Sequence, residues 1–158
     1  ELSYANNFKW AVSRGEDRYR RGMYTFFKRT SPHPNLITFD CPDSNVTCVK
    51  RNISNTPIAA LATLNNSVFT DAANAMAKRL IKERNSDTER IAMGFQLCTA
   101  RKPSTKEVAA FLALLKKAKL YYGENETEAK AFNGDAEASA WATLTRIFLN
   151  LDEFITRE

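Results

Sequence analysis

Residues 103–123, PSTKEVAAFLALLKKAKLYYG, decide the fold class of this chain. Ser104 and Glu107 have the spacing of a capping box, in which each side chain bonds a backbone N–H group at the start of a helix. Apolar residues then recur every three or four positions, with lysines between them. Gly123 is the expected end, because glycine adopts the backbone conformation that commonly follows a helix. The segment therefore predicts a long amphipathic helix.

Helix signals continue on both sides of this segment. Thr56 followed by Pro57 predicts a helix start, since threonine caps a helix and proline fits its first position. Asp135 is the expected cap of the last helix. Residues 124–134 are polar and predict a loop with at most one helical turn. The remaining expected helices are 57–64, 69–80, 86–98 and 136–149.

The N-terminal third has a different character. Residues 14–65 interleave cations, aromatics, prolines and short polar residues, without the apolar regularity of the later segments. We expect a first helix over 16–29, a loop over 30–55, and at most one short edge strand at 45–51. The predicted fold class is all-α, a compact multi-helix bundle with a long ordered loop near residues 30–55. Loops of this length in compact domains are usually functional or wrapped over a core.

Length and composition indicate one globular domain over residues 1–158. Apolar residues make up 44% of the 158 and charged residues 26%, as in ordinary soluble domains. No apolar run approaches the ~20 residues that span a bilayer, so we expect no membrane span. Residues 1–60 contain nine Lys/Arg against five Asp/Glu, which accounts for nearly all of the net charge of +5. Nucleic-acid binding is not expected, since no helix-turn-helix, zinc-finger or RNP pattern accompanies this charge.

The three cysteines do not form a known motif. No C-x-x-C or C-x-x-C-H pattern is present, so the chain has neither a zinc knuckle nor a c-type haem attachment site. Cys41 and Cys48 are compatible with a disulfide in an oxidising compartment and equally with two free thiols. Cys98 falls on an apolar helix face and is expected in the core. We expect no metal site, because the chain has one histidine and no clustered ligands.

Four strings together resemble one protein family. They are RRGMYTFFKRTSPHP (20–34), TFDCPD (38–43), SNTPIAALATLNN (54–66) and NLDEFITRE (150–158). The chain resembles the C-terminal domain known as domain of unknown function 1553, also called the planctomycete-type PSD domain. The resemblance is densest over 15–66 and again over 141–158.

The resemblance implies a helical domain at the C-terminal end of a larger, extracytoplasmic parent protein, and it implies that this chain is roughly the C-terminal half of the family domain. Such parents carry a cytochrome c-like domain and a second helical domain upstream, so haem is expected only in an upstream domain and no cofactor in this segment. The upstream helical domain is then the expected partner. The chain departs from the family pattern at Ser44, Asn45 and Ala59, where the family has Arg, Glu and Gln, and Thr47–Cys48 reverses the family's Cys-Thr order. If the replaced residues belong to a catalytic centre, this copy is impaired; if they are structural, the fold has repacked around them.

The candidate binding residues are cationic or polar and lie in the N-terminal third. If the loop folds back on the first helix, the cations converge into an anion or partner site, and Asp40 is placed to pair with Arg29 or Arg51. His33 lies between two prolines, without a nucleophile fixed beside it. No catalytic residue is assigned. The candidates are Arg21, Lys28, Arg29, His33, Asp40, Arg51 and Asn55.

The sequence leaves three kinds of function open. The first is a non-catalytic module that packs on an upstream domain and supports it. The second is part of an extracytoplasmic enzyme, acting on polysaccharide or linked to redox chemistry, and the third is a module that binds acidic glycans without turnover. The pattern favours the first for this segment, because no catalytic constellation is visible.

Overall fold

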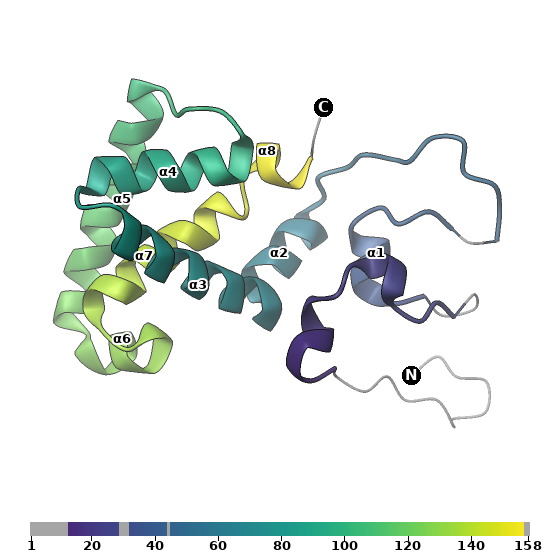
Figure 1. Ribbon diagram of the computed structural model, residues 1–158, viewed down its shortest axis with the longest axis horizontal. Coiled ribbons are helices and arrows are strands. Elements are labelled where there is room, and N and C mark those ends of the chain that lie inside the picture. Colours follow the sequence, from purple (N-terminus) through teal and green to yellow (C-terminus); the bar gives the residue numbers. More distant parts are fainter. Residues whose placement is uncertain (1–12, 29–31, 44, 157–158) are drawn as a thin grey trace. The chain divides into compact units, whose positions relative to one another are not determined.

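The computed structural model describes residues 13–28, 32–43 and 45–156, and its ordered segments are helical (Figure 1). The chain divides into two compact units, Glu1–Ala62 and Thr63–Glu158. No strand occurs in the described ranges, so the all-α prediction is confirmed, and the short strand considered at 45–51 is absent. The single domain expected over 1–158 stays a prediction. None of the described helices is long and apolar enough to cross a membrane.

The first unit contains short helical turns where a helix over 16–29 was predicted. That prediction is wrong for the described residues. Two 3-10 turns form instead, η1 (Gly15–Tyr19) and η2 (Gly22–Tyr24), with extended backbone at Arg20 and Arg21. Gly22 explains part of this difference, because a Cβ there would lie 2.7 Å from the Leu36 side chain. The backbone at Gly22 thus lies so close to Leu36 that any larger residue at position 22 would push the Leu36 side chain or the turn aside.

A short helix lies inside the predicted loop over 30–55. It is α1 (Pro34–Thr38), and His33 caps its start through a bond from the Asn35 backbone N–H to Nδ1, at 3.2 Å. The next helix, α2 (Pro57–Asn65), begins as expected: Thr56 Oγ1 accepts from the Ala59 N–H at 3.1 Å. The boundary between the two units falls within α2.

The second unit is a bundle of helices around α7 (Ala136–Phe148) (Figure 1). This helix packs against α3, α4, α5 and α6, and its buried residues include Trp141, Leu144 and Phe148. Capping signals place the helix starts: Ser86 with Glu89, and Ser104 with Glu107, form the capping boxes of α4 and α5. The surrounding helices are α3 (Ser67–Glu83), α4 (Asp87–Thr99), α5 (Thr105–Glu124), α6 (Glu126–Asn133) and α8 (Asp152–Ile155).

Two details of the predicted boundaries in this unit are wrong. The helix expected to end at Gly123 continues to Glu124, and Asn125 ends it by donating from Nδ2 to the Tyr121 carbonyl at 2.8 Å. Residues 126–133 form α6, a full helix where a polar loop was expected. Its stability comes from packing on α7, where Ala129 is buried and its carbonyl accepts from Ser139 Oγ at 2.8 Å.

Three phenylalanines form the centre of the second unit. The ring centroids of Phe95 and Phe111 are 5.8 Å apart, and Phe148 meets both rings edge-on. Gly94 allows this approach, because a Cβ there would lie 2.8 Å from the Phe148 ring. Cys98 is buried beside this cluster, as expected. Burial raises the pKa of its thiol to about 11, which keeps it protonated and unreactive.

Candidate functional site

Asp40 and Ser54 close the loop between α1 and α2. The Asp40 carboxylate accepts from the Ser54 backbone N–H at 2.7 Å and from Ser54 Oγ at 2.8 and 3.0 Å. Asp40 has a left-handed backbone, with φ of 54°, a conformation that aspartate tolerates better than most residues. The two residues are 14 positions apart, so these bonds fix both ends of the intervening segment. We call this pair the Asp40–Ser54 clamp.

The structure brings Arg51 to the clamp, but not as the expected ion pair. Its Nη2 atom donates to the Asp40 backbone carbonyl at 3.4 Å, and among the described residues no ion pair joins its guanidinium to the Asp40 carboxylate. That carboxylate is taken by Ser54, a residue the sequence analysis did not select. Arg29 lies outside the described residues, so its expected pairing with Asp40 stays a prediction.

The other candidate residues have separate positions in the first unit. His33 is the cap of α1, half-buried, with Nδ1 acting as an acceptor. This contact gives the only histidine of the sequence a helix-capping role. Arg21 and Asn55 are exposed, and Lys28 is half-buried. Within the candidate set, Arg51 contacts the Asp40 backbone carbonyl.

Apolar side chains of the first unit are largely exposed. Ala59 is the only buried residue among those that the structure describes in this unit. The arginine-rich turns carry exposed Met23 and Tyr24, and the segment before Ser54 carries exposed Val49. Large apolar residues exposed together mark interaction surfaces more often than ordinary solvent-facing surface. Among the described residues of this unit, the exposed large apolar residues are Tyr19, Met23, Tyr24, Phe26, Ile37, Val46, Val49, Ile53, Ile58 and Leu61.

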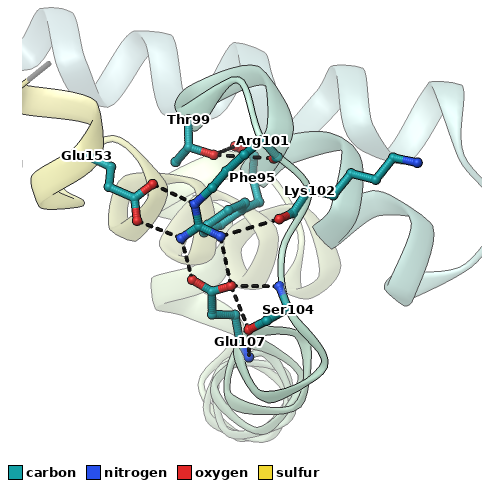
Figure 2. A network of polar contacts seen from close by, with 7 residues as sticks. All are labelled: Phe95, Thr99, Arg101, Lys102, Ser104, Glu107 and Glu153. Carbon is teal, nitrogen blue, oxygen red and sulfur yellow. Dashed lines mark hydrogen bonds and ion pairs between the residues drawn. The ribbon is translucent and has the colours of Figure 1, made fainter. Parts of the chain in front are cut away.

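A polar network in the second unit centres on Arg101, shown in Figure 2. Its guanidinium bonds the Glu107 carboxylate at 2.7 and 3.1 Å and the Glu153 carboxylate at 2.6 and 2.8 Å. It also lies over the Phe95 ring, with Cζ 4.7 Å from the centroid. One side chain thus links the α4–α5 connection to α5 and α8. All three guanidinium nitrogens of Arg101 have protein partners, so we assign the network to stability.

The network shifts the pKa values of its members. Hydrogen bonds from Arg101 and Ser104 lower the pKa of the Glu107 carboxyl to about 2, and the bond from Arg101 also lowers the pKa of Glu153. The hydrogen bonds to Glu153 and Glu107 raise the pKa of Arg101 itself. Because the carboxyl pKa values are depressed on folding, their contribution to stability is present above the ordinary carboxyl pKa.

These depressed carboxyl pKa values predict that the stability contributed by the Arg101 network at the α4–α5 connection is lost in acid. As the pH falls from about 4.5 towards 2, protonation of Glu107 should remove its contribution, and the melting temperature should fall. Glu107→Gln, which retains the capping geometry but not the charge, should have a smaller loss over the same range. Thermal unfolding measured by circular dichroism from pH 7 to 2 checks this, with Glu124→Gln as the control for an exposed glutamate. Equal pH dependence in all three proteins would contradict it.

A shallow cleft of about 390 Å³ lies between α5 and α7. Leu114, Ala118 and Ile147 supply apolar wall, and the Tyr122 hydroxyl is 3.2 Å from Thr143 Oγ1 at its edge. No group of three or more potential metal ligands occurs in the ranges that the structure describes. Cys41 and Cys48, for which the sequence left a disulfide open, are free thiols.

The described residues form an all-α domain. The model of the family described as a protein of unknown function (DUF1553) matches residues 2–115, and the chain belongs to this family. The resemblance found in the sequence is thereby confirmed, although its C-terminal stretch over 141–158 lies outside the matched residues. No curated protein and no solved structure matches the chain.

Two features of these sites were missed by sequence reasoning. Ser54 had a signal, since a short polar residue beside a proline-containing helix start is a natural loop anchor, but nothing local names its partner 14 residues away. Only one of the two carboxylates that bind Arg101 could be found from local sequence. The capping box identified Glu107, whereas Glu153 is 52 residues from Arg101. Both depend on tertiary contacts that local spacing does not encode.

Proposed function

We propose that this chain is a non-catalytic docking module of a larger extracytoplasmic protein, and that its first unit packs on an upstream helical domain of the same parent. The observation that carries the proposal is the mismatch between the two units. The second unit buries a large apolar core of its own, whereas the described part of the first unit buries only Ala59 and exposes many aromatic and aliphatic side chains. Apolar surface of this kind is stabilised when a partner removes it from water.

The chemistry of the sites also favours docking over catalysis. The Asp40 carboxylate and His33 Nδ1 are engaged in loop closure and helix capping, and Arg101 is fully bonded in the second unit. The proposal places any haem in an upstream domain of the parent, because the chain has no C-x-x-C-H motif. The cytochrome association and the extracytoplasmic location rest on the family resemblance and belong to the proposal.

A binding experiment tests this function. The 158-residue chain and the separately purified upstream region of its parent are titrated by isothermal calorimetry and sized by analytical ultracentrifugation. We expect a 1:1 complex, weakened about tenfold or more when Met23 and Tyr24 are both changed to serine, since buried anchors dominate binding energy. Leu120→Ser, on the exposed face of α5, is the control and should leave the affinity unchanged.

Two results would count against the proposal. One is a stable monomer that does not bind the upstream region at any accessible concentration. The other is a homodimer of this chain that the Met23 and Tyr24 changes disrupt, which would make a second copy the partner instead.

A further inference from the structure

The segment before Ser54 combines exposure with definite conformation. We call residues 45–53 the 45–53 loop. Val49 is 99% exposed, Val46 68% and Ile53 65%, so three β-branched apolar side chains face solvent within eight positions. Single exposed apolar residues are common, but several on one short loop are unusual for surface that stays in water. The loop therefore has the composition of a contact element.

The Asp40–Ser54 clamp holds this loop in place at its end. Ser54 donates both its backbone N–H and its hydroxyl to one carboxylate, and Arg51 donates to the Asp40 carbonyl from within the loop. Asp43, just before the loop, accepts from the backbone and side-chain nitrogens of Asn45 at 3.0 and 2.7 Å. Ordering these residues before binding lowers the entropy lost on association.

The loop is cationic, and its charge is not neutralised within the described residues. Lys50 and Arg51, together with Asn52 and Ile53, line a hollow of about 370 Å³. Neither cation forms an ion pair with a described carboxylate. The whole first unit carries nine Lys/Arg against five Asp/Glu, whereas the second carries fourteen against thirteen. A cationic hollow beside apolar side chains complements a carboxylate with apolar neighbours.

From this geometry we infer that the 45–53 loop recognises an acidic face of the partner protein. A partner Asp or Glu side chain enters the hollow between Lys50 and Arg51, and apolar partner residues cover Val46, Val49 and Ile53. The inference rests on the proposed docking function and adds the chemistry of the partner surface. The Asp40–Ser54 clamp acts as a positioning element that presents the loop.

The test measures association with the upstream region by surface plasmon resonance at 50 and 300 mM NaCl. Changing Lys50 and Arg51 together to glutamine should slow association about fivefold or more at low salt and flatten the salt dependence. Val49→Ser should mainly speed dissociation. Ser54→Ala, which leaves every loop charge in place, should weaken binding without lowering the unfolding midpoint of the second unit. Lys78→Gln, an exposed lysine of α3, is the charge control and should have no effect.

The outcomes separate this inference from the function on which it rests. A complex that the Met23 and Tyr24 changes weaken, but that the Lys50, Arg51 and Val49 changes leave intact, keeps the docking function and overturns the acidic-face inference. Absence of any complex overturns both. Binding to a sulfated dextran that requires Lys50 and Arg51, without binding to the upstream region, would assign the loop to an acidic glycan and also overturn it.

Discussion

Trp141→Ala should lower the free energy of unfolding by about 3–5 kcal/mol, the largest single-residue effect that we expect in this protein. Trp141 is fully buried in α7, the helix that the other helices of the second unit surround. Removing the indole leaves a cavity among helices whose own packing fixes their spacing, so the site collapses only in part.

Urea denaturation followed by far-ultraviolet circular dichroism measures this effect. Leu120→Ala is a suitable control, because Leu120 is 65% exposed on α5 and its truncation should change stability by no more than about 0.5 kcal/mol. A loss below about 1 kcal/mol for Trp141→Ala would show that α7 is not the centre of the core.

Arg90→Ala should have the next largest effect, a loss of about 2–3 kcal/mol. Arg90 is a capping residue for the end of α3, since Nε donates to the Arg84 carbonyl at 2.9 Å and Nη2 to the Ile81 carbonyl at 3.3 Å. These carbonyls have no partner within α3, and a cation at a helix C-terminus also interacts favourably with the helix dipole. The guanidinium additionally lies 5.6 Å from the Trp141 ring centroid.

Arg79 provides a matched comparison on α3 itself. The Arg79 side chain is 54% exposed and pairs only with Glu83, four residues away, whereas that of Arg90 is 12% exposed. Arg79→Ala should therefore cost about 0.3–0.5 kcal/mol, as for other exposed helix pairs. Both variants are measured by the same urea titration. Equal losses for the two arginines would refute the capping role.

The helical body was largely predictable because its signals are local. Ser104 with Glu107, Ser86 and Asp135 mark helix starts through bonds between residues three positions apart, and apolar periodicity then identifies the buried face. Family membership was predictable as well, from three short strings within 20–66 and a fourth over 150–158; the family model matches the first three and not the fourth.

The first unit was harder to predict for a physical reason. Its aromatic residues have helical spacing, which indicated a helix over 16–29, but amphipathic helices depend on a core to bury their apolar face. The described residues of the first unit offer no such core, and Gly22 instead packs closely on Leu36. The partner of Asp40 was also predicted incorrectly for Arg51. Charge favoured an arginine, but in the structure the Asp40 carboxylate accepts hydrogen bonds from Ser54.

The position of α7 late in the chain affects how the protein is made. Synthesis at roughly 5–20 residues per second places about 2–10 s between the end of α4 at Thr99 and the end of α7 at Phe148. During that interval the apolar faces of α3 and α4 lack the helix that covers them in the folded protein. Because α3 and α4 both pack on α7, the second unit completes its core only after Phe148 has been synthesised and has left the ribosome.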